Sequence, residues 1–135
     1  MFQHLLKRLP ENFPLQASFA PALEIWSVVQ SRPEPQLAIL SFGKRDASYD
    51  IDLPVPHAWF NAERHGVPQP VSSQWEIFKL NDQHAFLRLP PEASLAVGDF
   101  VSCGISHPCT TFDKWKLLYL VDDAYTIVDA IKTYF

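Results

Sequence analysis

Residues 75–89 read WEIFKLNDQHAFLRL, two short apolar runs separated by a polar turn at residues 81–83. Apolar side chains alternate with polar ones in both runs, imperfectly in the first, and this pattern is typical of paired strands. Two prolines at 90–91 end the second run, because proline has no amide hydrogen to donate to a neighbouring strand. The stretch therefore predicts an antiparallel β-hairpin.

The rest of the chain continues this β pattern. Further strands are predicted over residues 22–30, 37–42, 100–105, 115–121 and 125–135. The run LAILSF is continuously apolar, which predicts a strand buried on both faces. The last segment also fits a short helix, but its β-branched and aromatic residues favour a strand. We expect a mainly β fold, an antiparallel barrel or sandwich of about seven or eight strands.

Two segments are expected to lie outside this pattern. Residues 1–20 form a leading segment, with a possible short amphipathic helix over 2–9, and residues 21–135 form the β domain. Within that domain, residues 54–73 contain four prolines and predict a long surface loop. Loops of this length without internal structure are usually functional or mobile.

Composition limits the function classes. The chain has 135 residues, of which 47% are hydrophobic and 19% charged, which suits one domain with its own core. Its net charge of −4 gives no basic face for nucleic acid. No apolar run approaches the roughly 20 residues that span a bilayer. The N-terminal sequence MFQHLLKRLPENF does not resemble a secretory signal, so a cytoplasmic location is expected.

The segment ISHPCTTFDKW places two good metal ligands, His107 and Cys109, two positions apart. On a strand both side chains would point to one face, where they could bind the same Zn²⁺. No second His-x-Cys or Cys-x-x-Cys completes a structural zinc site, and a packed cysteine beside a surface histidine explains the pair equally well. A Cys109 nucleophile with His107 as its base is less favoured, because their Cβ atoms would be about 7 Å apart.

Two other polar groupings are candidates for a binding pocket. The segment GKRDASYD carries Lys44, Arg45 and Asp50, which could hold a carboxylate or phosphate or could form a solvated charged turn. Asp82 and His84 flank the predicted hairpin turn. They fit an acid/base pair, but also an Asx-turn beside a partly buried histidine.

The remaining notable side chains are expected to be structural. A disulfide between Cys103 and Cys109 would require a tight chain reversal and an oxidising compartment, so it is not expected. Among the tryptophans, Trp26 and Trp75 are assigned to the core, whereas Trp59 lies in the predicted loop and fits an interface.

Residues 104–115 (GISHPCTTFDKW) and 120–135 (LVDDAYTIVDAIKTYF) resemble the C-terminal end of bacterial amino-acid deaminases. These enzymes belong with the D-serine dehydratases and D-threonine aldolases. The resemblance continues through residues 21–50 and 79–90, and covers about residues 15–135 with its motifs in the same order.

The resemblance implies a two-domain enzyme. Its N-terminal domain is an alanine-racemase-like (β/α)₈ barrel that holds pyridoxal phosphate on a lysine, and its C-terminal domain is a β structure. The motif matching His107-Pro108-Cys109 implies zinc ligands at His107 and Cys109, with the metal helping the β-hydroxyl of a D-amino acid to leave. The residues expected to line or support the substrate pocket are Lys44, Arg45, Asp50, Asp82 and His84.

A chain of 135 residues cannot contain the barrel, which typically needs about 250 residues. We therefore expect the metal-site and dimerisation domain of a pyridoxal-phosphate-dependent lyase, with no catalytic residue that acts in this chain alone. Pyridoxal phosphate would bind only in the complete enzyme, a homodimer. The alternative is a non-enzymatic β module for dimerisation or ligand binding. The sequence leaves open which amino acid is used, and whether elimination or retro-aldol cleavage occurs.

Overall fold

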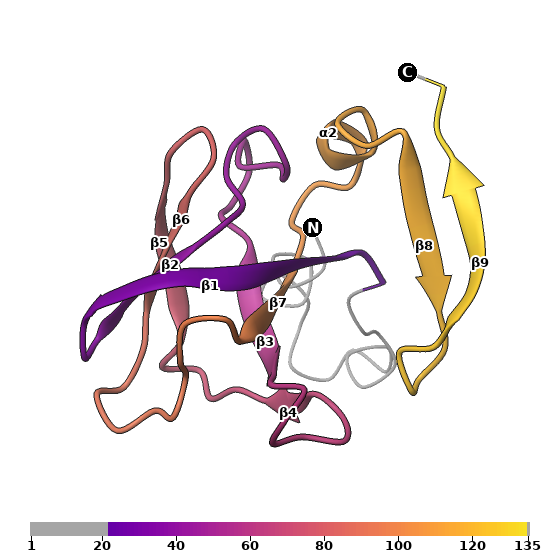
Figure 1. Ribbon diagram of the computed structural model, residues 1–135. Coiled ribbons are helices and arrows are strands. Elements are labelled where there is room, and N and C mark those ends of the chain that lie inside the picture. The colour runs from indigo at the N-terminus through magenta and orange to yellow at the C-terminus, as the bar shows by residue number, and fades with distance from the viewer. Residues whose placement is uncertain (1–21, 135) are drawn as a thin grey trace, which may run out of the picture.

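The computed structural model describes residues 22–134 (Figure 1). The helix predicted over residues 2–9 lies outside the described residues. The strands are β1 (Glu24–Glu34), β2 (Leu37–Leu40), β3 (Val55–Phe60), β4 (Gln69–Pro70), β5 (Glu76–Leu80), β6 (Ala85–Arg88), β7 (Phe100–Gly104), β8 (Leu117–Val121) and β9 (Ile127–Lys132), and one short helix, α2, spans Cys109–Phe112.

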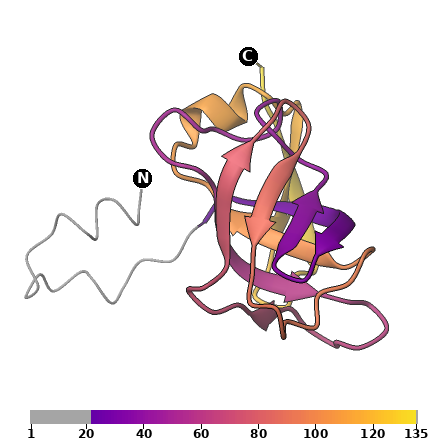
Figure 2. The same cartoon turned by 90° about the vertical axis from the view of Figure 1, so that its left-hand side faces the viewer.

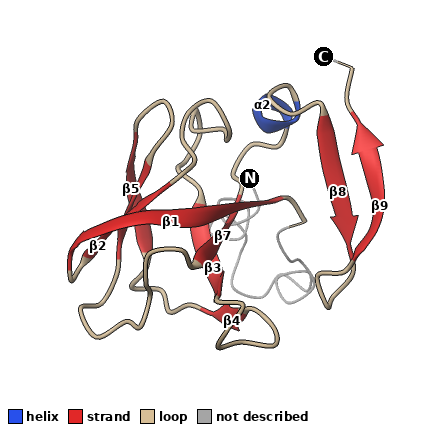
Figure 3. Ribbon diagram, in the orientation of Figure 1, coloured by secondary structure: helices blue, strands red, loops and turns tan. Residues whose placement is uncertain are grey.

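The prediction of a mainly β, antiparallel fold is confirmed (Figure 3). Seven strands form one sheet in the order β4-β3-β7-β1-β2-β6-β5, and every neighbouring pair is antiparallel. The sheet curls like half of a barrel (Figure 2), so that β3 contacts β5 across the curl. The buried side chains on the concave side form one core.

The predicted hairpin is β5–β6, and its irregular pattern has a structural cause. Ile77 pairs with Leu87, but Leu80 pairs with Ala85, so the register shifts by one residue between these pairs. This bulge leaves Phe78 without a partner and brings both Ile77 and Leu80 to the core, although they are three positions apart.

Strand β2 differs from its prediction in burial. Ala38 and Leu40 are fully buried, whereas Leu37 and Ile39 are only partly buried. The run LAILSF is continuously apolar, but the core buries the face that carries Ala38 and Leu40 more completely than the face that carries Leu37 and Ile39.

The prediction of a long loop over residues 54–73 is wrong, because the structure places β3 and β4 there. Strand β3 lies between β4 and β7. Its register is irregular between Pro56 and Ala58, and Pro56 is paired with Cys103. A proline without an amide hydrogen is tolerated at such an irregularity.

Strands β8 and β9 form a separate two-stranded sheet to one side of the curled sheet (Figure 1). This confirms the strands predicted over residues 115–121 and 125–135. Tyr125, in the turn between them, has a φ of 59°, the left-handed conformation that side chains other than glycine rarely adopt. Within residues 22–134, no helix has the length and apolar character needed to cross a membrane.

Candidate functional site

Two segments that the sequence marked as chemically interesting lie against one another. His107 Nδ1 is 2.6 Å from Asp50 Oδ2, and Thr110 Oγ1 donates to Asp50 Oδ1 at 3.2 Å. The backbone amide of His107 donates to Ser48 Oγ, while the amide of Ser48 donates to Thr111 Oγ1 at 3.0 Å. These bonds fix residues 43–50 to the segment that contains α2.

The turn of the β5–β6 hairpin is the third segment at this place. The amide of Lys44 donates to the carbonyl oxygen of Asn81 at 2.9 Å, and the amide of Arg45 donates to that of Asp82 at 3.1 Å. Gly43 permits this approach, because a Cβ added there would meet these two carbonyl oxygens at 2.4 and 2.5 Å. The three segments therefore share one end of the sheet (Figures 1 and 2).

Asp46 fixes the conformation of the middle segment. Its Oδ2 accepts a hydrogen bond from the amide of Gly43 at 2.8 Å, and its amide donates to the carbonyl oxygen of Gly43 at 3.0 Å, so the two residues close the turn. Its carbonyl oxygen accepts one from Trp115 Nε1 at 2.7 Å, just before β8 begins. These hydrogen bonds of Asp46 hold the loop of residues 43–50 in place, and with it the position of Asp50 beside His107.

The electrostatics favour a charged Asp50. The hydrogen bond with His107 is the largest effect and lowers the pKa of Asp50. Desolvation opposes it, and bonds from its own amide and from Thr110 lower the pKa further. An ionised Asp50 only accepts hydrogen bonds, so His107 Nδ1 is the donor. Nε2 of His107 has no hydrogen-bond partner within residues 22–134, so it can give or take a proton.

The predicted zinc site at His107 and Cys109 is wrong. The described part of the chain contains no group of three or more His, Cys, Asp or Glu side chains that could hold a metal ion. The spacing argument assumed a strand, but Pro108 already has helical dihedral angles, φ −63° and ψ −35°, and Cys109 begins α2. Cys109 is exposed, whereas His107 is bound to Asp50.

The other pocket candidates lie at the same end of the sheet, but no hydrogen bond or ion pair joins their side chains to one another among the described residues. Lys44 and Arg45 are exposed, and Lys44 Nζ lies 5.4 Å from the centre of the Tyr49 ring. Asp82 is exposed, and His84 is partly buried. No side-chain hydrogen bond joins Asp82 to His84 among the residues described. A substrate pocket built from these residues stays a prediction.

Lys44 and Lys79 do not have the environment of a lysine that binds pyridoxal phosphate. A Schiff-base lysine works from a desolvated pocket. Lys44 instead lies over Tyr49 and Lys79 lies 4.7 Å from the centre of the Phe86 ring, both on the surface. We assign neither lysine to the cofactor.

The two cysteines are free and lie in different environments. Cys103 is fully buried in β7, and burial, with a smaller effect from Glu24, raises the pKa of its thiol far above the usual range. Cys109 is exposed, and among the residues described no hydrogen bond connects its thiol to His107. The arrangement that a Cys–His nucleophile needs is therefore not formed by this pair.

A second polar cluster escaped the sequence analysis. The carboxylate of Glu24 accepts hydrogen bonds from Ser102 Oγ at 2.9 Å and from the Tyr125 hydroxyl at 3.2 Å, and it lies 3.0 Å from His57 Nε2. Trp26 Nε1 donates to the same carboxylate at 3.1 Å. Three neighbouring strands and the β8–β9 turn supply these side chains, so no local motif reveals the cluster.

Glu24 and Tyr125 of this cluster each shift the pKa of the other. Burial tends to raise the pKa of Glu24, but His57, by its hydrogen bond and charge, together with Ser102 and Tyr125, lowers it below the usual value. Burial, and then the charge of Glu24, raise the pKa of Tyr125. His57 Nδ1 is buried without a hydrogen-bond partner in the described part of the chain. Because Ser102 and Glu24 both contact Nε2, the cluster is not a nucleophile–base relay.

Comparisons with known proteins agree with the resemblance. Residues 22–121 match the family described as "Putative serine dehydratase domain". Among solved structures, a D-threonine aldolase from Filomicrobium marinum has a similar fold, with a TM-score of 0.66 and 22% sequence identity. The match covers 90% of this chain but only 30% of the aldolase chain, so this chain spans under a third of that protein. A search among curated proteins gave no match.

Proposed function

The chain belongs to the serine dehydratase domain family, and from this premise we propose that it serves a lyase that releases the β-hydroxyl group of a small D-amino acid. The proposal assigns the chain a supporting part of the active site. The remainder of the lyase supplies the groups that activate the α-carbon. A D-amino acid is preferred over its L-isomer because the solved relative with this fold is named a D-threonine aldolase.

The observation that carries the proposal is the bond between Asp50 and His107. Hydroxide is a poor leaving group, so the departing oxygen needs a proton as its bond to the β-carbon breaks. The Asp50 carboxylate stabilises a protonated imidazole through Nδ1 and leaves Nε2–H available as the donor. In this role His107 protonates the hydroxyl oxygen, which leaves as water, and the proton takes the place of the metal that the sequence suggested.

The charges around this pair support an amino-acid ligand. Lys44 and Arg45 are exposed at the same end of the sheet, and neither forms an ion pair with any residue in the described range 22–134. A guanidinium or ammonium group binds a carboxylate by a charge-assisted hydrogen bond. We propose that one of these two side chains holds the substrate carboxylate in the assembled lyase.

The β8–β9 hairpin supports the proposal that the lyase is a homodimer and that this domain alone is inactive. Both strands carry large apolar side chains that are exposed to solvent, among them Leu117, Tyr119, Val121, Ile127 and Ile131. An isolated two-stranded sheet is marginally stable in water. An apolar patch of this kind is typical of a surface that another part of an assembly covers.

The proposal is tested by product formation from β-hydroxy amino acids. The wild-type protein, assembled with its catalytic barrel, is incubated with D-serine and with D-threonine, and the release of keto acid, ammonia and aldehyde is measured. Keto acid with ammonia indicates elimination, and aldehyde indicates retro-aldol cleavage. We expect elimination to dominate, and the absence of all three products contradicts the proposal.

A matched pair of variants separates this function from a non-enzymatic β module. Asp50→Asn removes the carboxylate that orients His107, whereas Asp123→Asn removes an exposed carboxylate in the β8–β9 turn. The lyase proposal expects turnover to fall about 10- to 100-fold only in Asp50→Asn. Equal turnover by Asp50→Asn and Asp123→Asn would support the non-enzymatic β module.

A further inference from the structure

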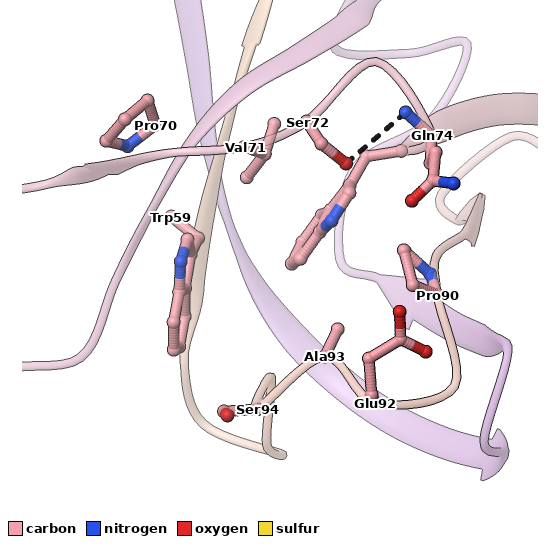
Figure 4. A pocket seen from close by; sticks show the side chains of 10 residues that line it. Trp59, Pro70, Val71, Ser72, Gln74, Pro90, Glu92, Ala93 and Ser94 are labelled. Atoms are coloured by element: carbon pink, nitrogen blue, oxygen red, sulfur yellow. Dashed lines mark hydrogen bonds between the residues drawn. The ribbon is translucent and has the colours of Figure 1, made fainter.

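A groove of about 280 Å³ lies beside β4 (Figure 4), at the other end of the curled sheet from α2 and the His107–Asp50 pair (Figure 1). Its lining comes from the end of β3, the segment after β4, and the loop after β6. Figure 4 shows Trp59 on one side and Pro90 with Glu92 on the other, with Ala93 between them. The candidate site uses none of these residues.

The groove presents aromatic rings. The rings of Trp59 and Trp75 line it together, with centroids 6.5 Å apart and planes inclined by 32°. The guanidinium of Arg64 lies over the Trp59 ring at 5.3 Å, so this indole already interacts with a cation. Tryptophan is the side chain whose ring attracts cations most strongly.

The groove carries one carboxylate. Glu92 is the one charged residue among those that line the groove in the described part of the chain. It is exposed and has no hydrogen bond or ion pair with any described residue. Two arginines also reach this loop: Arg64 is paired with Asp99 at 2.7 Å, and Arg32 is bonded to the carbonyl oxygens of Ala93 and Leu95. Neither is paired with Glu92, so this carboxylate beside the two indole rings can accept a positively charged ligand.

We propose that the Trp59–Trp75 groove binds a small organic cation that carries an alkylammonium group. The cation lies against the indole rings, its charge faces Glu92, and its alkyl groups contact Val71, Pro90 and Ala93. The volume is slightly below the range of about 300–1,000 Å³ that holds drug-sized molecules, so the ligand is small. The groove lies away from His107, so its ligand is distinct from the substrate of the proposed lyase.

The test is an NMR titration of the full chain with choline, which follows the four indole N–H signals. Saturable shifts of Trp59 and Trp75 are expected. Trp26 and Trp115, whose indole N–H groups are bonded to Glu24 and to the carbonyl of Asp46, serve as internal controls. The comparison ligand is the neutral isostere in which carbon replaces the charged nitrogen. It is expected to bind at least about fivefold more weakly.

The matched variants are Glu92→Gln and Asp123→Asn, which change the net charge equally, and neither residue is in the core. Glu92→Gln is expected to weaken choline binding about threefold or more, whereas Asp123→Asn leaves it unchanged. The proposal is overturned if choline gives no saturable shift, if the isostere binds equally well, or if both variants respond alike. A lysine-rich peptide that binds where choline does not would identify a protein-docking surface instead.

Discussion

His107 Nδ1 lies 2.6 Å from Asp50 Oδ2, although 57 positions separate the two residues in the sequence. The pair joins the loop after β2 to the segment before α2, two stretches whose polar residues were candidates for a site in the sequence. The amide of His107 donates to Ser48 Oγ and the amide of Ser48 donates to Thr111 Oγ1, and these two bonds hold the segments together. The imidazole therefore has one nitrogen fixed and one available.

Replacing His107 by alanine is expected to raise the pKa of Asp50 toward its usual value. The hydrogen bond with His107 is the largest cause that lowers this pKa, and Thr110 contributes less. Asp50 stabilises the fold while it is ionised, so this contribution is lost as the pH falls through its lowered pKa. The check is a ¹³C titration of the carboxyl group. Thr110→Val should give a smaller rise, and an unchanged pKa in His107→Ala would contradict the assignment.

Gly43→Ala is expected to destabilise the protein by about 1–3 kcal/mol, because the new methyl group would collide with the carbonyl oxygens of Asn81 and Asp82. Gly66→Ala is the matched control, since nothing lies within 4 Å of a Cβ at that position. Urea unfolding measures both variants. Equal stabilities would mean that the loop after β2 and the β5–β6 turn are not packed as described.

Asp99 holds the loop beside the groove in place. Its side chain is 1% exposed, it accepts from Arg64 Nη2 at 2.7 Å and from the amide of Ala96 at 2.9 Å, and it also accepts a hydrogen bond from Asn61 Nδ2. Asp99→Ala removes the acceptor of Asn61 Nδ2 and of the Ala96 amide, whereas Arg64, 42% exposed, can bind water instead; a loss of about 1–3 kcal/mol in the free energy of unfolding is expected.

The control for Asp99 is the exposed ion pair between Arg88 and Glu76, whose atoms are 2.6 Å apart. Glu76→Ala is expected to change the free energy of unfolding by no more than about 1 kcal/mol, because both charges stay solvated. Similar losses in Asp99→Ala and Glu76→Ala, measured by urea unfolding, would contradict the structural role of Asp99.

Tyr125→Phe is expected to loosen the β8–β9 hairpin. The variant keeps the edge-to-face contact with Trp26, at 5.1 Å between ring centres, but loses the hydrogen bond to Glu24. A loss of about 0.5–1.5 kcal/mol is expected, seen as faster amide exchange over residues 117–132. Exchange that is unchanged in this range would show that the hydroxyl does not anchor the hairpin.

The Tyr125 hydroxyl also predicts that the protein loses stability at alkaline pH. Burial and the nearby Glu24 raise the pKa of Tyr125, so its contribution to stability is complete below the usual tyrosine pKa and is lost as the pH rises through the raised value. Unfolding measured against pH should show this loss in the wild type and not in Tyr125→Phe.

The sequence predicts the strands well where apolar periodicity is strong. The hairpin over residues 75–89 and the strands within 22–30 and 100–105 are all present. Strand β3 escaped prediction because Pro56 reads as a loop residue, and only the irregular pairing with β7 shows how the sheet accepts it. Prediction of pairing needs the neighbouring strand, which local sequence does not contain.

The candidate site was predictable in its residues but not in its chemistry. Asp50 and His107 were both selected from the sequence, yet their contact depends on two loops that meet only in the folded chain. The spacing of His107 and Cys109 suggested zinc because it assumed extended backbone, whereas α2 begins at Cys109 and the described residues contain no group of three or more side chains that could hold a metal ion. The Glu24 cluster draws on distant strands and left no local signal.

The most direct test of His107 as the proton donor compares two leaving groups in the smallest assembly that turns over D-serine. Chloride leaves without a proton, so β-chloro-D-alanine does not need a general acid, whereas D-serine does. In His107→Gln, kcat/KM for D-serine is expected to fall about 10²- to 10⁴-fold while that for β-chloro-D-alanine changes little. An equal loss for both substrates would contradict the account and reduce His107 to a structural residue.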